Sequence, residues 1–350
     1  MLSNKTNCGV CYSSTGTHIF VVFVMVLLVL AILFGNCISL AVFLGGKHFR
    51  TPQGYLKVSL AVADLALGVL VVPFSVYWEL SLLLTNSTFL DWERGTSTGV
   101  SWYLCNVVGT VFAGCTLVSI ATIFLLTIER SIAILKPLHK DSVITRRRTL
   151  MLIPLSWLTC YFLALSPMIF SHGAIVMEYD HCSRMCIYAP VSSTHAGQIL
   201  LLFPAFDFSL LGGTLIINAL SLATIHKCTR RRRMLAGKGH RLPRLSFSDI
   251  KATKTIGALT IIFTASFSPI AVFVVGSVIG YQWCTFSFFA FWILASNSCF
   301  NVIVYIVCDH HFRDGARKLL LLSPQDTLQS HNSTSQSAER STPDIRCSEL

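Results

Sequence analysis

Charged side chains are scarce in this 350-residue chain. They make up 12% of the residues, about half the share of a soluble domain, whereas apolar residues make up 53%. So few polar groups cannot cover a water-facing surface, and this scarcity excludes an ordinary soluble protein. It also excludes nucleic acid as the partner that a net charge of +11 would suggest in a soluble protein.

Motifs that assemble catalytic groups are also absent. The chain has no HExxH, no GxSxG, no phosphate-binding loop and no constellation of paired carboxylates. A membrane enzyme would need such groups clustered, so we expect no enzymatic activity. Inverted repeats with broken spans are typical of transporters, and no repeat is visible here. A transporter therefore remains only as an alternative from another functional class.

Long apolar stretches are what the chain has in abundance. A helix that crosses a bilayer core needs about 20 mostly apolar residues, and seven stretches meet that length. We expect them at Ile19–Leu44, Tyr55–Leu84, Val100–Leu135, Leu150–Ser171, Ala196–Ile225, Ile250–Gly280 and Thr285–Val307. The prediction is an all-α membrane protein with a seven-transmembrane helix bundle over residues 19–308.

Positive charges are distributed unevenly among the segments that join these spans. If the N-terminus lies outside, only Lys5, Arg94 and Arg184 of the 27 basic residues are outside. Because cytoplasmic segments carry an excess of Lys and Arg, we expect residues 1–18 to be extracellular. Residues 309–322 are expected to form a short amphipathic eighth helix on the inner membrane surface. The polar residues 323–350 are expected to form a disordered cytoplasmic tail, and the inner basic groups to attract anionic membrane lipids.

Cysteines and glycosylation signals agree with this orientation. Asn4 and Asn86 begin extracellular Asn-X-Thr sequences and are candidate glycan sites. Disulfides persist on the oxidising side of a membrane, but six cysteines allow many pairings, which the sequence leaves open. The six that we expect outside are Cys8, Cys11, Cys105, Cys182, Cys186 and Cys284.

A few polar residues fall inside the expected spans. A carboxylate at the bilayer centre costs about 2.5–3.5 kcal/mol on insertion scales, so Asp64 must face the bundle interior. Its candidate companions at similar depth are Asn36, Ser119, Asn297, Ser298 and Asn301. Such oxygens either hold a small hard cation or form a hydrogen-bonded network between helices. Asp207 is either a ligand site or, as we favour, a partner of a neighbouring helix. Arg130 has Glu129 and Asp249 as candidate ion-pair partners.

The order of these residues resembles that of the rhodopsin-like (class A) G protein-coupled receptors. The resemblance extends over roughly residues 35–312. It rests on Gly35-Asn36, the run Leu60-Ala61-Val62-Ala63-Asp64-Leu65, Cys105, Glu129-Arg130-Ser131, Lys136-Pro137-Leu138, Trp157, Pro167, Pro204, Phe263, Pro269, Asn301-Val302-Ile303-Val304-Tyr305 and Phe312. It implies a plasma-membrane receptor that passes the signal of a small extracellular ligand to heterotrimeric G proteins.

The resemblance also implies roles for the matched residues. A sodium ion would be held as an allosteric modulator by Asp64, Ser119, Asn297, Ser298 and Asn301. Arg130 would be restrained by Glu129 and Asp249 at rest, Asn301 and Tyr305 would belong to the same switch, and Leu138 would contact the G protein. Cys105 would pair with Cys182 or Cys186. The Ser/Thr-rich tail would be a substrate of receptor kinases and a site for arrestin.

Four positions depart from the family pattern. Phe267 replaces a Trp, Val302 replaces the Pro of the NPxxY motif, Ser131 replaces a Tyr, and Gly212 stands where a Tyr usually meets the arginine network. Three of these four positions belong to the activation relay. An alternative is therefore a receptor-fold protein that is constitutively active or that does not signal, such as a decoy.

The expected ligand pocket is largely apolar. Phe112 stands where amine receptors have an Asp, and Val274 where adenosine receptors have an Asn. Few polar anchors are present, so we expect a neutral or lipid-like ligand. The rest of the expected lining is Ala113, Thr116, Ala196, Leu200, Phe267, Ile270, Ala271 and Phe291. Glu79 is either a contact for a cationic ligand or, as we favour, a solvated helix end.

Overall fold

The computed structural model describes residues 15–46, 49–85, 99–135, 145–191, 196–236, 247–281 and 283–321. Several predicted features lie outside these residues: the glycan sites Asn4 and Asn86, the G protein contact Leu138, and the tail from residue 323 onward. The predicted eighth helix is described up to Leu321.

Seven helices in the described part of the chain are long and apolar enough to cross a membrane, which confirms the predicted bundle. The second span consists of α2 (Pro52–Ala66), a π-helical segment η2 (Leu67–Val71) and α3 (Val72–Thr85). The other spans are α1 (Thr15–Gly45), α5 (Gly99–Leu135), α7 (Arg146–Phe170), α9 (Leu202–Ala236), α10 (Phe247–Ile279) and α11 (Cys284–Cys308). The eighth helix is α12 (His310–Leu321).

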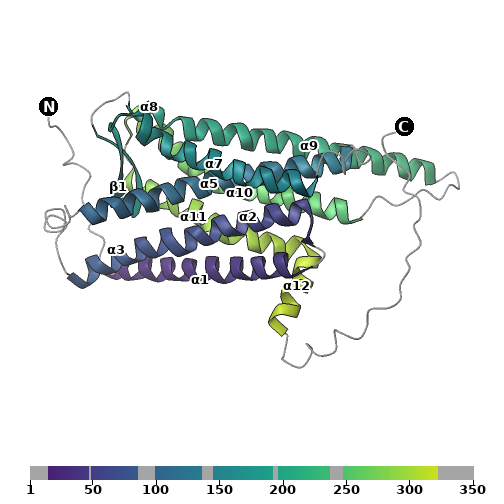
Figure 1. Ribbon diagram of the computed structural model, residues 1–350, viewed down its shortest axis with the longest axis horizontal. Coiled ribbons are helices and arrows are strands. Elements are labelled where there is room, and N and C mark those ends of the chain that lie inside the picture. Colours follow the sequence, from purple (N-terminus) through teal and green to yellow (C-terminus); the bar gives the residue numbers. More distant parts are fainter. Residues whose placement is uncertain are drawn as a thin grey trace.

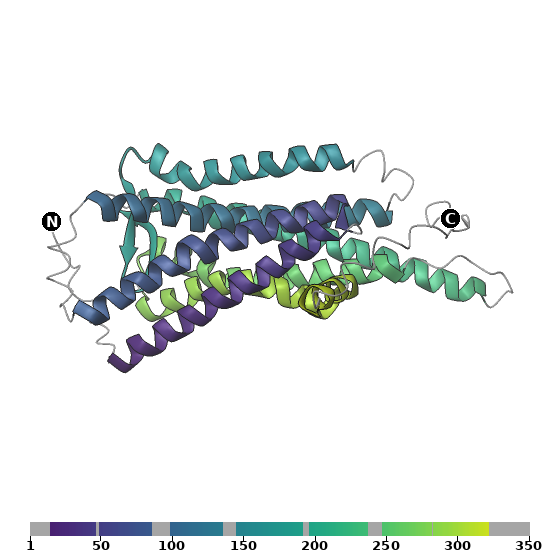
Figure 2. The ribbon, with the colours of Figure 1, turned by 60° about the horizontal axis from the view of Figure 1, so that its bottom comes forward.

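The spans run side by side along the long axis, and the two ends of the bundle differ (Figure 1). A two-stranded sheet lies at one end, here called the hairpin end. The opposite end, here called the Arg130 end, carries the last turns of α5. There α12 turns away from α11 and lies across the direction of the bundle in both views (Figure 2).

Local sequence signals set two of the helix starts at the Arg130 end. The Thr51 hydroxyl accepts a hydrogen bond from the Gly54 N–H at 3.2 Å, and Pro52 occupies the first turn of α2. Thr145 caps α7 in the same way through the Arg148 N–H at 3.3 Å. A side-chain cap of this kind stabilises a helix by about 1 kcal/mol, and proline fits the first turn because its missing N–H would be unpaired there.

A two-stranded sheet, which the sequence did not predict, adds to the predicted helical bundle. Strands β1 (Ile175–Asp180) and β2 (Met185–Pro190) pair antiparallel, with Tyr179 opposite Cys186. Ile175 and Met177 are buried while Glu178 is exposed, so part of the segment shows the alternation of a strand. This alternating pattern is short and lies in a connection between two spans, so it was not recognised as a strand from the sequence.

The start of the fifth span also differs from the prediction at Ala196. Residues Ala196–Ile199 form a separate turn, α8, and the long helix α9 begins at Leu202. Pro204 has no N–H to bond the carbonyl of Leu200, four residues before it, so this hydrogen bond is missing at the junction of α8 and α9.

Candidate functional site

A buried polar cluster lies around Asp64 in α2. Its carboxylate is 1% exposed, and its Oδ2 accepts a hydrogen bond from Asn301 Nδ2 of α11 at 2.8 Å. Asn36 in α1 donates through Nδ2 to the carbonyls of Ile32 and Ser298, both at 3.0 Å. Side chains of three spans are thereby joined where the sequence placed intramembrane polar residues.

Three buried oxygens of this region have no hydrogen-bond partner among the described residues. They are Asp64 Oδ1, Ser119 Oγ and Tyr305 Oη. Asn297 and Ser298 are also buried. Because buried polar atoms are normally paired, an unpaired carboxylate oxygen and a hydroxyl fit a small hard cation. Asp64 and Ser119, two of the residues that the resemblance assigned to sodium, thus offer unpaired oxygens.

Most of the predicted ligand lining belongs to one large apolar core that extends through the bundle, here called the chamber cluster. Phe112, Phe267, Ile270, Ala271 and Phe291 are buried in it, and Ala113 and Val274 pack against it. The rings of Phe112 and Phe291 lie 5.9 Å apart. The Thr116 hydroxyl bonds the Phe112 carbonyl at 2.8 Å, so its donor is already used.

Leu200 is not a member of the chamber cluster, and Thr116 is not among its apolar members. Leu200 is half-buried in the turn between α8 and α9. The side chain of Ala196 lies outside what the structure describes. A hollow of about 240 Å³ lies elsewhere, between α5, α7 and α9, with Phe124, Leu155 and Phe206 among its lining residues.

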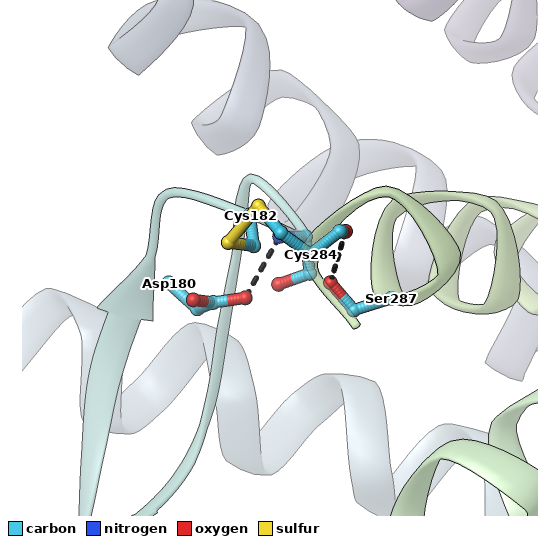
Figure 3. The surroundings of a disulfide bond; sticks show 5 residues. Asp180, Cys182, Cys284 and Ser287 are labelled. Atoms are coloured by element: carbon cyan, nitrogen blue, oxygen red, sulfur yellow. Dashed lines mark hydrogen bonds between the residues drawn. A yellow bond between two sulfur atoms is a disulfide. The ribbon is translucent and has the colours of Figure 1, made fainter. Parts of the chain in front are cut away.

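Two disulfides join the β-hairpin to α5 and α11 at the hairpin end. Of the two partners that the sequence left open for Cys105, the structure selects Cys186, so that α5 is joined to β2. The second bond joins Cys182, in the turn between the strands, to Cys284 at the start of α11 (Figure 3). Beside it the Asp180 carboxylate accepts a hydrogen bond from the Ser183 N–H at 2.7 Å.

Glu79 corrects the expectation of a solvated helix end. Its side chain in α3 is 2% exposed because the hairpin covers it. Its Oε2 lies 2.8 Å from an Arg184 nitrogen and 3.0 Å from His18 Nδ1. The Tyr179 hydroxyl donates to Oε1 at 3.4 Å. Burial, followed by the charge of Glu79, raises the pKa of Tyr179 well above its usual value.

At the Arg130 end, Gln53 connects the two members of the predicted ion pair. The guanidinium of Arg130 donates to Gln53 Oε1, and Gln53 Nε2 donates to Glu129 Oε2. Arg130 Nε lies 3.6 Å from Glu129 Oε2. Sequence reasoning missed Gln53, because an uncharged residue in the first turn of a helix gives no signal. The predicted partner Asp249 lies in α10, but its side chain is outside the described residues.

A second set of contacts at this end surrounds Tyr305, which is 2% exposed. The Lys57 Nζ lies 5.0 Å from the centre of the Tyr305 ring, 5.3 Å from that of Phe43, and 2.9 Å from Asp309 Oδ2. Burial opposes the charged form of Asp309, but the charge and hydrogen bond of Lys57, together with the Phe312 N–H and the charge of His311, outweigh it and hold the pKa of Asp309 below its usual value.

The positions that depart from the family pattern have distinct surroundings. Val302 packs on Gly35, where an added Cβ would lie 3.1 Å from Val302 Cγ2, so α1 and α11 approach closely. A Cβ at Gly212 would meet nothing within 4 Å. Asp207 is 2% exposed, and its Oδ1 has no hydrogen-bond partner among the described residues, so the expected bond to a neighbouring helix is not seen for that atom.

Comparisons with known proteins agree with the architecture. A family model described as "7 transmembrane receptor (rhodopsin family)" matches residues 35–305. The histamine H2 receptor of Canis lupus familiaris is 26% identical over 345 residues, which cover 95% of this chain and 87% of that receptor. Galanin receptor type 2 of Mus musculus is 28% identical, over 85% of this chain and 74% of its own length. The GQ-coupled rhodopsin of Mizuhopecten yessoensis is 27% identical, over 80% and 55%.

Proposed function

The chain belongs to the rhodopsin family of seven-transmembrane receptors, and from this we propose that it carries an extracellular signal to heterotrimeric G proteins at the plasma membrane. The family consists of multi-pass membrane receptors and not of enzymes. The named relatives include a histamine receptor, a galanin receptor and a rhodopsin, so their names do not point to one class of ligand.

In the proposed orientation the hairpin end faces the outside of the cell. Both disulfides of the described residues lie at this end, and disulfides persist in an oxidising environment. Lys57, Arg130 and the run Arg146–Arg148 lie at the opposite end, as the excess of positive charge on cytoplasmic segments requires.

The observation that carries the proposal is the restraint of Arg130 by Gln53 and Glu129. These bonds are non-covalent, so the arginine can be released when the Arg130 end opens. A ligand shifts this equilibrium only by binding the two states with different affinity. Release of Arg130 then exposes a guanidinium to the G protein, with α10 and its Asp249 moving outward.

The test is nucleotide exchange on a panel of purified G proteins, with membranes that contain the full chain. Arg130→Ala should reduce exchange at least tenfold for the G protein that responds, and Asp249→Ala should raise basal exchange. Unchanged basal and stimulated exchange in both variants, across all G protein classes, would contradict the proposal.

The alternative of a constitutively active or non-signalling receptor is favoured by Gly212, Phe267 and Val302. Gly212 has no side chain where the family has a tyrosine, and a Cβ there would meet nothing within 4 Å. In the same assay, high exchange without ligand would identify a constitutively active receptor. No exchange with any G protein would identify a decoy.

The proposed ligand is small and neutral or lipid-like, because it must fit among Phe112, Phe267 and Phe291. These side chains offer apolar surface and no charge, so affinity would come from burial. Receptor kinases and arrestin are proposed partners of the tail at residues 323–350.

A sodium ion is the proposed allosteric modulator, held by Asp64 and Ser119 with Asn297, Ser298 and Asn301 nearby. The unpaired oxygens of Asp64 and Ser119 support this site. Raising sodium chloride at constant ionic strength should lower basal nucleotide exchange in the native receptor and leave it unchanged in Asp64→Asn. Equal sensitivity to sodium in both proteins would remove the site from the proposal.

A further inference from the structure

The carboxylate of Glu79 is the centre of an enclosed polar site at the hairpin end. Three separate segments contribute to it: His18 from α1, Tyr179 from β1, and Arg184 from the turn between the strands. With 2% of the residue exposed, Glu79 has been removed from water. A buried carboxylate requires a charged or hydrogen-bonding partner, and here a guanidinium supplies both.

Aromatic rings complete a surrounding that suits an organic cation. The guanidinium carbon of Arg184 lies 5.6 Å from the centre of the Phe288 ring of α11. Trp78 stacks on Tyr179 with ring centres 5.2 Å apart, which orients the Tyr179 hydroxyl towards Glu79. A carboxylate combined with an aromatic face is the chemistry by which proteins bind amines and guanidines.

The backbone of the turn is held in an unfavourable conformation to present Arg184. Its φ of 58° lies in the left-handed region, which disfavours residues other than glycine. Neighbouring contacts maintain this conformation: Trp292 Nε1 donates to the Ser183 carbonyl at 3.0 Å, and Cys182 is bonded to Cys284. Strain that is maintained by surrounding contacts is typical of functional positions.

The polar site adjoins the chamber cluster. Met185 and Cys186, which follow Arg184 directly, belong to the same buried cluster as Phe112 and Phe291. Gly109 of α5 permits this approach, because a Cβ there would lie 2.7 Å from the Met177 sulfur and 3.1 Å from the Cys186 carbonyl. Gly109 lies three residues before Phe112 in α5, so a ligand that extends from Phe112 towards the outside would reach the surroundings of Glu79.

We propose that Glu79, Tyr179 and Phe288 form a binding subsite for an organic cation, which Arg184 occupies in this structure. The cationic end of the ligand, an amine or a guanidine, replaces Arg184 there while its apolar body lies in the chamber. This inference rests on the proposed receptor function and changes the expected ligand: it is not neutral throughout, but apolar in its body and positively charged at its outer end. Exchange of one cation for another leaves Glu79 paired in both states.

The test removes the internal cation and supplies a free one. Purified full-length Arg184→Ala receptor in detergent micelles is heated with increasing methylguanidinium chloride, and its Tm is measured. Binding to the folded state should raise the Tm by about 2 °C or more at concentrations well above the Kd. The native receptor, whose Arg184 competes, should need at least tenfold more methylguanidinium for the same rise.

Four controls make the result specific. Urea, a neutral molecule of similar shape, should give no rise at the same concentrations, and neither should sodium chloride. Arg313→Ala, which removes an exposed guanidinium that bonds the Ile306 and Val307 carbonyls at the other end, should respond no more than the native protein. Adding Glu79→Gln to Arg184→Ala should abolish the rise.

If the double variant does not fold, Phe288→Leu with Arg184→Ala keeps the carboxylate and should need several times more methylguanidinium. The proposal is overturned if Arg184→Ala shows no rise, or if loss of Glu79 or Phe288 leaves the rise unchanged. Because the Tm does not depend on G proteins, a receptor that binds methylguanidinium but never couples would contradict only the proposed function.

Discussion

The two ends of the bundle are held together by different kinds of bond. At the hairpin end, two disulfides join the sheet to α5 and α11, and the buried Arg184–Glu79 pair adds a link to α3. At the Arg130 end, the described residues are connected by non-covalent contacts, among them the bonds of Gln53 and the Lys57–Asp309 pair.

This difference indicates which end can move. Breaking a disulfide requires chemistry, whereas exchange of hydrogen bonds between side chains requires only thermal motion. When the helices of a bundle are joined at one end, a small rearrangement at that end can separate the helices at the opposite end. We therefore expect the hairpin end to serve as a fixed reference and the Arg130 end to open.

The largest effect is expected from removal of a disulfide. Cys105→Ser leaves Cys186 unpaired and frees the hairpin from α5, which should cost about 2–5 kcal/mol of folding free energy. Surface expression in cells and the Tm of purified receptor measure this loss. Cys37→Ser is the matched control, because Cys37 is a free and exposed cysteine of α1, and should leave both unchanged. An unaltered Tm in Cys105→Ser would remove the distinction between the two ends.

A smaller effect is expected at the Arg130 end. Gln53→Ala removes the side chain that connects Glu129 with Arg130, and loss of a hydrogen bond to a charged group costs about 1.5–3 kcal/mol. Because the closed state is weakened, basal nucleotide exchange should rise by about tenfold or more while surface expression is retained. Gln198→Ala, an exposed glutamine of α8, should leave exchange unchanged. A fall in basal exchange in Gln53→Ala would mean that Gln53 belongs to the open state instead.

The sequence predicted the seven spans and the polar centre because both follow from the cost of the membrane. A carboxylate such as Asp64 must find partners inside the bundle, so its companions were identifiable from depth alone, and Asn301 is indeed bonded to it. The eighth helix was found through its charged and apolar faces.

The hairpin end was predicted poorly because its contacts join distant parts of the chain. Tyr179 and Arg184 contact Glu79 from about 100 residues away in the sequence. The sequence around Glu79 does not indicate that the hairpin covers it. The pairing of Cys182 with Cys284 is one of many possible disulfide pairings, and the sequence does not indicate which of them forms. Gln53 was missed for another reason: an uncharged side chain at a helix start has many equally ordinary roles.

The smallest effect, and the one that depends on pH, is expected from the Lys57–Asp309 pair. Both side chains are largely buried, at 12% and 15% exposed, so Asp309→Asn should lower the stability of the receptor by about 1 kcal/mol at neutral pH. The pKa of Asp309 in the folded protein is lower than its ordinary value of 3.8. The Lys57–Asp309 ion pair therefore stabilises the protein at pH values above 3.8. The stability difference between native and Asp309→Asn receptor should therefore be constant near neutrality, decrease as pH falls below about 4, and vanish below the folded pKa.

Asp314→Asn provides the comparison within the same helix, because Asp314 forms an exposed pair with His310 at 2.9 Å. Solvent screens that pair, so its loss should change the Tm little at any pH. A Tm difference for Asp309→Asn that grew on acidification would show that burial, and not Lys57, dominates the titration of Asp309. Lys57→Met keeps the aliphatic contact with Phe43 and Tyr305 while it removes the charge. It should abolish the same part of the stability that is lost at acid pH. If it did not, α12 would be held to the bundle by apolar packing alone, and the ion pair could be removed from the contacts that close the Arg130 end.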